Sequence, residues 1–562
     1  MLAYIIYAVR TLLRTLGNLT RRLKRAPDYV VFILDGTYPE LRPPRGPFWQ
    51  RWISPPPTSL QDLTERFCQV AGDPRVRGVI LHLRQLRMAP AQLQTLRDLI
   101  AELRAAGKRV IAWSPSQYDN ASYYVASAAD EILLQTGGSI MPLGIRRSFL
   151  FLVDALERIG LKADLLQISP YKSAGDILTK RSMPAEVREM ANWLIDADHA
   201  EFIRGITEGR RLDEGQSRSL IDNAPYTDVE AQSAGVVDKL ISEEDLPVHL
   251  GSQEKPARIT HWEEAQRRLL RPPIPRLGRY IALLRIEGDI IDGRSGRPPF
   301  KPPMRLPFLL NERAGDLSVV QDARRVLADK LAAALVVYVD SGGGSATASE
   351  AMAAALEKVA AKKPLVVAMG SVAGSGGYYV TTPARWIVAQ PGTITGSIGV
   401  LMGKIVNAGL LEKLLFNRET ISRGKHAMFL SSERPFSDEE REALLRQIKR
   451  TYDVFLERVA ISRKMTREAV EAVGGGRVWT GRQALEHKLV DELGGLEKAL
   501  AKARQLANLD ARAPVREVKR GKQMLLPTSS SSLALAQYAL EGLQLLDSSS
   551  ALCLCPLLWE ER

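Results

Sequence analysis

Ser375, which lies between glycines, is the residue of this sequence best placed for covalent chemistry. It follows the apolar run 365–368, which predicts a buried strand, and the bulky residues from Tyr378 onward predict the start of a helix. Glycines leave room for a substrate backbone, and the N-terminal amides of a helix favour developing negative charge. This setting suits an acyl-transfer nucleophile. An isolated Gly-Ser-Gly is also typical of an ordinary tight turn, so other features must decide.

A second strand, glycine turn and helix occur upstream. The apolar residues 335–339 run through Asp340 into the turn 341–345, and a helical pattern begins near Ala348. Parallel strands place such turns at one edge of a sheet, so the amides of this turn can face Ser375. Amides in that position would form an oxyanion hole.

Three glycine- and serine-containing segments occur in order along the chain: Asp340–Glu350, Gly374–Tyr379 and Thr395–Val400. Together they resemble the long, two-repeat form of signal peptide peptidase A, a serine protease of the Clp-protease/crotonase fold. The resemblance implies an α/β fold, a tandem duplication of a Clp-protease/crotonase-like domain with parallel sheets and packed helices. Gly342 stands where the family usually has proline, and Asp340 where it has asparagine. A looser oxyanion loop is expected, because proline would fix one backbone dihedral.

An internal repeat supports the duplication. The order strand, helix, strand at 79–83, 92–106 and 109–113 recurs about 255 residues later at 335–339, 348–361 and 365–368. The same offset aligns Tyr123–Val125 with Tyr378–Val380, and Gly144 with Gly399. We therefore predict a tandem duplication.

In this alignment, the first copy lacks the residues that would make it catalytic. Asn120 falls at the place of Ser375, and Arg84–Arg87 at the place of the glycine turn. The first copy therefore lacks both a nucleophile and an oxyanion loop.

A serine hydroxyl needs a base before it can attack. Of the histidines, His426 and His487 follow Ser375 as in an α/β-hydrolase, but residues 373–377 do not form the Gly-x-Ser-x-Gly motif. A lysine can serve where burial makes the neutral amine available. The duplication relates Lys172 to Lys425, each of which follows a strand-like run, so the residues leave both open.

The resemblance assigns further roles. In long-form relatives the base lies in the segment that here reads Tyr-Lys-Ser-Ala at 171–174, so we predict Lys172, with Lys425 as the alternative. Ser397 is similar to a family serine that holds the lysine amine. Gly343 and Gly376 would offer the oxyanion amides, and neither a metal nor another cofactor is implied.

The N-terminal residues 2–23 predict a basic amphipathic helix. Apolar residues recur at steps of three and four, with arginines such as Arg10, Arg14 and Arg21 between them. The uncharged run 1–9 is far shorter than the roughly 20 apolar residues that a spanning helix needs. We expect the helix to lie on an anionic membrane surface. An ordinary helix docked on the core would show the same period.

Composition fits a globular chain with two large domains: 562 residues, 45% hydrophobic, with a net charge of +13. The charge comes without a zinc-finger or RNA-recognition motif, so we expect no nucleic acid partner. The three cysteines, Cys68, Cys553 and Cys555, support neither a disulfide framework nor a four-cysteine zinc site.

The predicted organisation has five parts: a membrane-associating helix at 1–26, a degenerate repeat with the candidate base at 27–266, a proline- and arginine-rich linker at 267–279, a catalytic repeat at 280–510, and a tail at 511–562. Loops are expected at 43–57 and 293–307, and a short amphipathic helix near 533–546. We assign the tail no function.

The favoured function is a membrane-associated serine endopeptidase with a Ser-Lys dyad, which degrades short hydrophobic peptides such as cleaved signal peptides. Its expected location is a bacterial inner membrane, on an undetermined side, and the resemblance implies a homo-oligomeric ring. The alternatives are a noncatalytic crotonase-like acyl-binding scaffold and a membrane-remodelling scaffold.

Overall fold

The computed structural model describes residues 2–44, 56–141, 144–297, 311–518 and 552–554. The chain forms two compact units, Met1–Ile145 with Asp198–Leu277, and Arg146–Ala197 with Gly278–Arg562. These units differ from the predicted repeats at one place. Residues 146–197, which precede the linker in sequence, belong to the unit of the second repeat. The repeat boundaries themselves stay predictions.

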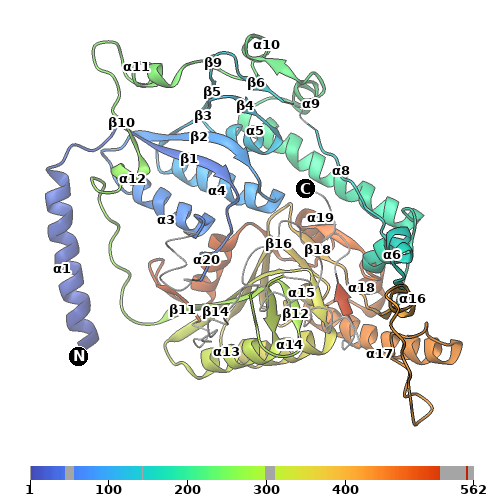
Figure 1. The fold of residues 1–562 in the computed structure, drawn as a ribbon. Coiled ribbons are helices and arrows are strands. Elements are labelled where there is room, and N and C mark those ends of the chain that lie inside the picture. The colour runs from blue at the N-terminus through green and yellow to red at the C-terminus, as the bar shows by residue number, and fades with distance from the viewer. Residues whose placement is uncertain (1, 45–55, 142–143, 298–310, 519–551, 555–562) are drawn as a thin grey trace. The chain divides into compact units, whose positions relative to one another are not determined.

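The first unit contains a parallel six-stranded sheet (Figure 1). Its strands, in spatial order, are β10 (Ile259–His261), β1 (Tyr29–Gly36), β2 (Gly78–Leu86), β3 (Arg109–Ser114), β5 (Glu131–Leu134) and β9 (Lys239–Leu240). Helices α3 (Leu60–Ala71) and α4 (Pro90–Ala105) pack with the apolar core of this sheet. The alternation of strands and helices in the sequence therefore predicted the sheet correctly.

The second unit repeats this order of parallel strands: β22 (Val515–Glu517), β11 (Tyr280–Glu287), β14 (Ala332–Ser341), β16 (Leu365–Gly374), β17 (Trp386–Ala389) and β21 (Glu492–Leu493). The last three residues of β16 pair in parallel with β18 (Ile394–Gly396), and β20 (Val478–Thr480) pairs antiparallel with β18. A matching set of β4 (Gln117–Tyr118), β6 (Ser139–Ile140) and β8 (Tyr226–Thr227) occurs in the first unit. The common strand order is what a duplicated fold produces.

Helices enclose the sheet of the second unit. α13 (Asp316–Ala328) and α14 (Ala346–Ala360) share one apolar cluster with β14. α20 (Leu496–Leu506) packs on β14 and β16 through buried residues outside that cluster, so it covers the opposite face. The sheet is therefore buried on both sides, as its nearly continuous apolar strands predict.

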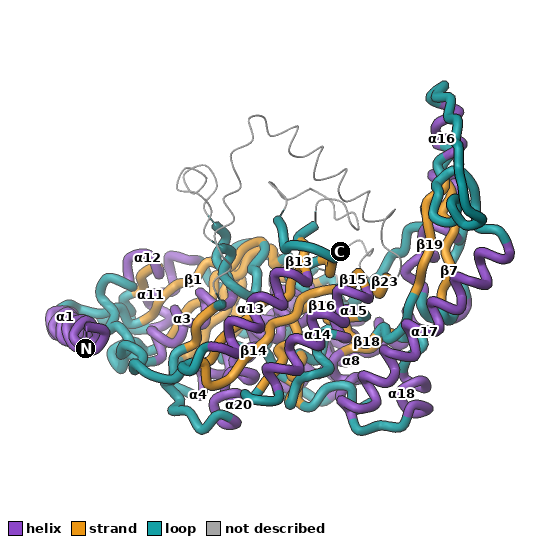
Figure 2. Tube along the Cα trace, turned by 90° about the horizontal axis from the view of Figure 1, so that it is seen from below, coloured by secondary structure: helices purple, strands orange, loops and turns teal. Residues whose placement is uncertain are grey.

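A further sheet of the second unit borders the glycine turn. Its order is β13 (Arg313–Gly315), β12 (Asp289–Ile291), β15 (Gly343–Ser345), β23 (Leu552–Leu554), β19 (Leu401–Val406) and β7 (Lys162–Gln167) (Figure 2). β7 comes from the segment 146–197, and it pairs antiparallel with β19 over six residue pairs. This pairing brings the Lys172 segment into the second unit.

The N-terminal helix is α1 (Leu2–Arg22), as predicted. Among the described residues, none of the helices combines the length and apolarity needed to cross a membrane. Most of the two predicted loops, and the predicted helix near 533–546, lie outside the described residues.

Candidate active site

Ser375 lies at the sharp bend between β16 and the single-turn helix α15 (Gly376–Tyr379). Its φ is 55° and its ψ is −116°, a conformation that non-glycine residues rarely adopt. The Ser375 amide donates to the Gly396 carbonyl at 2.8 Å, which holds the bend against β18. Such strain is typical of a residue whose position serves chemistry. The predicted helix is only a single turn, so its dipole offers little to a developing negative charge.

The amine of Lys172 contacts this serine directly. Lys172 Nζ lies 2.7 Å from Ser375 Oγ, and it donates to the Ser397 carbonyl at 2.9 Å and to Ser397 Oγ at 3.0 Å. All three side chains are fully buried. Burial penalises the charged form of an amine, and a neutral amine can accept the proton of the hydroxyl. The predicted nucleophile, base and base-orienting serine therefore lie together.

Two glycines make room for the lysine. A Cβ on Gly476 would lie 2.5 Å from the Lys172 backbone nitrogen and Cα, and Gly476 has a φ of +90°. A Cβ on Gly399 would lie 3.2 Å from Lys172 Cδ. The Ser397 amide donates to the Arg477 carbonyl at 2.6 Å, which ties the serine to the residue that follows Gly476. Lys172 therefore passes close to the backbone of both glycines, where a larger side chain would displace it.

Strand pairing and an aromatic stack position the segment that carries Lys172. The Ile168 amide donates to the Val400 carbonyl at 3.0 Å, next to the β7–β19 ladder. Trp193, on α8 (Ala185–Arg210), stacks on Trp479 with ring centroids 4.8 Å apart and on Tyr171 at 6.1 Å. Trp193 Nε1 also donates to the Val478 carbonyl at 2.9 Å. We call Tyr171, Trp193 and Trp479 the aromatic clamp.

Lys425 has a different environment from Lys172. Its side chain is 69% exposed and forms an ion pair with Glu439. His487 packs against Trp479, with ring centroids 4.2 Å apart, and burial lowers its pKa. The geometry thus supports Lys172 as the base.

The two glycines predicted to supply oxyanion amides are neighbours. A Cβ on Gly376 would lie 3.2 Å from Gly343 Cα, so the two glycine loops touch. The Gly343 amide donates to Ser341 Oγ at 3.1 Å, and that hydroxyl donates to the Gly288 carbonyl at 2.6 Å. A substrate oxygen would have to replace the Ser341 contact to reach the Gly343 amide. The oxyanion role of both glycines stays a prediction.

The first unit retains the framework of a site without its chemistry. Asn120, at the place of Ser375, donates from Nδ2 to the Gly144 carbonyl and accepts from the Gly144 amide at 3.0 Å. In the second unit, Ser375 Oγ lies 3.5 Å from the carbonyl of the corresponding Gly399. The Asn120 side chain therefore contacts Gly144 in the first unit as Ser375 contacts Gly399 in the second.

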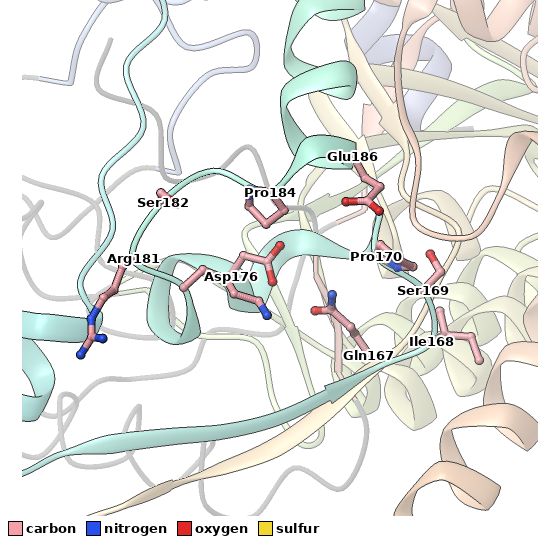
Figure 3. Close-up of a pocket in the computed structure, with 10 residues that line it drawn as sticks. Gln167, Ile168, Ser169, Pro170, Asp176, Arg181, Ser182, Pro184 and Glu186 are labelled. Atoms are coloured by element: carbon pink, nitrogen blue, oxygen red, sulfur yellow. The ribbon is translucent and has the colours of Figure 1, made fainter.

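A pocket of about 660 Å³ opens beside the stretch 167–170 that leads to Lys172 (Figure 3). Asp176, Lys180, Arg181 and Glu186 line it, and its lining includes neither Ser375 nor Lys172. Burial raises the pKa of Asp176 to about 6, although Lys180 and a hydrogen bond with Gln167 oppose the shift. The pocket thus carries acidic and basic side chains, which the apolar substrates that we expect do not require.

Several residues of the site escaped the sequence analysis. The aromatic clamp has no local signature, because Trp193 and Trp479 lie far apart in the chain. The Ser341 hydroxyl was missed because its acceptor, the Gly288 carbonyl, is also distant. The run Gly474–Gly476 was a visible signal, since consecutive glycines often mark a close backbone approach.

Comparisons with known proteins show the family to which the chain belongs. The model of Peptidase family S49 matches residues 102–255 and 357–510, one match in each repeat. "Serine protease SPPA, chloroplastic" of Arabidopsis thaliana is 31% identical over 80% of this chain and 66% of its own length. "Protease 4" of Haemophilus influenzae is 29% identical over 80% of this chain and 73% of its own length, and that of Salmonella typhi is 30% identical over 80% and 72%. These relatives support a serine-type peptidase. The chain belongs to Peptidase family S49, carries the family's domain twice, and resembles the long, two-repeat form of signal peptide peptidase A.

Proposed function

We propose that this chain is a membrane-associated serine endopeptidase that cleaves short hydrophobic peptides, such as released signal peptides, with Ser375 and Lys172 as a dyad. The observation that carries the proposal is the 2.7 Å contact between Lys172 Nζ and Ser375 Oγ in a fully buried site. In a peptidase, a contact of this length is suited to direct proton transfer.

The reaction follows from the contacts. Neutral Lys172 accepts the Ser375 proton while Oγ attacks the scissile carbonyl, and Ser397 keeps the resulting ammonium hydrogen-bonded. The predicted amides at Gly343 and Gly376 would stabilise the oxyanion. Lys172 then returns the proton to the leaving amine, and water, deprotonated by the same lysine, hydrolyses the acyl-enzyme.

The orientation of α1 supports membrane association. Arg14 donates to the Pro272 carbonyl, Asn18 to the Arg271 carbonyl, and Arg21 to the Leu269 carbonyl, so the polar side of the helix faces the protein. Its large apolar side chains are exposed, among them Tyr4, Ile5, Ile6, Val9, Leu12, Leu13, Leu16 and Leu19. A helix docked on the core would bury its apolar side instead. An apolar face with flanking arginines fits an anionic lipid surface.

The resemblance also supports a homo-oligomeric ring at a bacterial inner membrane. Light scattering of the purified protein tests the assembly, and fractionation of cells tests the location.

The decisive experiment for the activity is labelling with a fluorophosphonate probe, which reacts only with an activated serine. We expect one adduct on Ser375, none in Ser375→Ala, and unchanged labelling in Ser371→Ala, a control on the same strand. Hydrolysis of an apolar peptide should disappear in Ser375→Ala. An unlabelled but folded protein would instead favour an acyl-binding or membrane-remodelling scaffold.

A further inference from the structure

Strand β16 contains a bulge at 370–372, just before the nucleophile. β14 and β16 pair residue for residue up to Val339 and Met369, but the next pair joins Ser341 to Ala373. β16 therefore advances by four residues where β14 advances by two. After this shift the end of β16 pairs with β18, and the chain then turns into the nucleophile. Bulges next to active sites commonly re-aim a side chain in this way.

The side chain of Asp340, at the end of β14, bonds to the backbone of this bulge. The Val372 amide donates to Asp340 Oδ1 at 2.9 Å. The Gly370 carbonyl accepts from Thr393 Oγ1 at 2.8 Å. A Cβ on Gly370 would lie 2.8 Å from the Cβ of Asp340, so the absence of a side chain lets the bulge approach the carboxylate. Two side chains, one from β14 and one from the residue before β18, thus hold the bulge.

The first unit is built differently at the corresponding place. There the strand is interrupted, because β3 ends at Ser114 and β4 begins at Gln117. The offset of about 255 places Gln85 at the position of Asp340. Gln85 is exposed, and its side-chain oxygen accepts from Arg87 at 3.0 Å. The carboxylate contact to a bulged strand therefore occurs in the repeat that carries the nucleophile.

We infer that Asp340 is a positioning residue, which holds the bulge of β16 so that Ser375 meets Lys172. The inference rests on the proposed peptidase function. The bonded amide lies three residues before the nucleophile, and a displacement of about 1 Å at a reacting atom can lower a rate by about a hundredfold. Loss of this contact should therefore reduce kcat more than substrate binding.

The contact requires an acceptor oxygen and not a negative charge. Asp340 pairs across the strands with Glu287 of β11. Burial raises the pKa of Glu287 to about 7, the carboxylates of Glu312 and Asp340 add to this shift, and Arg285 and Arg297 oppose it. Asparagine, which the family usually has at this position, would keep the acceptor and remove the repulsion from Glu287. Asp340→Asn is therefore the conservative variant.

Hydrogen exchange tests the contact without any need for activity. D340A removes the acceptor, D340L removes it while filling the space, and D340N keeps it. All three are made in the Ser375→Ala protein. We expect the Val372 amide to exchange about tenfold faster or more in D340A and D340L than in the parent, and at close to the parent rate in D340N. Equal exchange in all four proteins would overturn the inference.

Kinetics test the positioning. With Ser375 restored, D340A and D340L should lower kcat for an apolar peptide about tenfold or more with little change in KM, and D340N should retain most of the activity. Asp491→Ala is the matched control, because Asp491 accepts from the Ile387 amide at 2.8 Å at the far end of the same sheet. It should keep the parent's kcat.

Three results would overturn the positioning role. Equal losses in D340A and D340N would assign the effect to the charge, and an unchanged kcat in D340A and D340L would show that the site does not depend on the contact. D340A and D340L proteins that do not fold, beside a folded D340N, would show that Asp340 serves the fold alone. A protein without turnover or probe labelling in any form, the parent included, would instead contradict the proposed peptidase function, and exchange at Val372 would still decide whether Asp340 holds the bulge.

Discussion

Lys172 Nζ and Ser375 Oγ are 2.7 Å apart, although 203 positions separate the two residues in the sequence. The lysine precedes the linker, yet the segment 146–197 that carries it packs within the unit of the second repeat. The first repeat has Asn120 in place of a nucleophile, but its segment 146–197 still contributes to the second unit. It supplies Lys172, the proposed base, which contacts Ser375 of the second repeat.

The first prediction separates the two candidate bases. Lys172→Met keeps most of the side-chain volume but removes the amine, and it should lower kcat by about 10²- to 10⁴-fold, the usual effect of losing general-base catalysis. Lys425→Met should stay within about twofold of the parent, because that side chain is exposed and paired with Glu439. Peptide hydrolysis at pH 7 and pH 9 measures both. An inactive Lys425→Met beside an active Lys172→Met would reverse the assignment.

The strands around the site could be predicted from the sequence because apolar runs and glycine turns are local signals. β14 and β16 lie where the runs at 335–339 and 365–368 predicted them. The choice between Lys172 and Lys425 could not be made from local pattern, since both follow strand-like runs and only tertiary pairing separates them. β23 could not be predicted from the sequence either, because a three-residue strand forms only where β15 and β19 offer open edges.

The second prediction concerns Trp193 as a positioning residue. Trp193→Ala removes the middle of the aromatic clamp and should lower kcat about tenfold or more with little change in KM, because the Lys172 segment loses its support. Trp193→Phe keeps the stack and should restore most of the activity. In the Lys172→Met protein, Trp193→Ala should have no further effect on kcat. Independent, additive losses would mean that the tryptophan has only a structural role.

The third prediction uses two glycines with similar backbone conformations. Gly476 has a φ of +90° and touches the Lys172 backbone, whereas Gly424 has a φ of +94° and has nothing within 4 Å of a Cβ. Alanine at either position should cost about 1 kcal/mol of stability through backbone strain. Only Gly476→Ala should also abolish most peptide hydrolysis, since it displaces Lys172. Equal activities of the two variants at equal melting temperatures would show that the close approach is not needed.

The fourth prediction follows from Asp176, whose pKa burial raises to about 6. A raised carboxyl pKa means that the folded state binds the proton more tightly than the unfolded state. Asp176 therefore stabilises the fold below about pH 4, and this contribution is lost as the pH rises through 6. Relative to the parent, Asp176→Asn should gain roughly 2 kcal/mol in unfolding free energy between pH 4 and pH 7. Urea unfolding at both pH values measures this gain, and parallel pH profiles would contradict it.

The last prediction concerns α1 as a membrane anchor that is separate from catalysis. Leu12 and Leu16 are 60% and 51% exposed on the side of the helix away from its contacts with residues 266–272. Replacing both by serine keeps the arginines, and with them the contacts of Arg14 and Arg21 to the protein. It reduces only the apolar area that could enter a bilayer, at about 25 cal/mol for each Å² no longer buried.

We therefore expect L12S/L16S to bind vesicles that contain anionic lipid at least tenfold more weakly than the parent, with unchanged hydrolysis of a soluble peptide. Leu317→Ser, at a residue 59% exposed on α13, is the matched control and should bind as the parent does. Vesicles of neutral lipid should bind the parent more weakly than anionic ones, because Arg10 and Arg22 lose their electrostatic attraction. Flotation of L12S/L16S equal to that of the parent would show that the apolar side of α1 is not the membrane anchor.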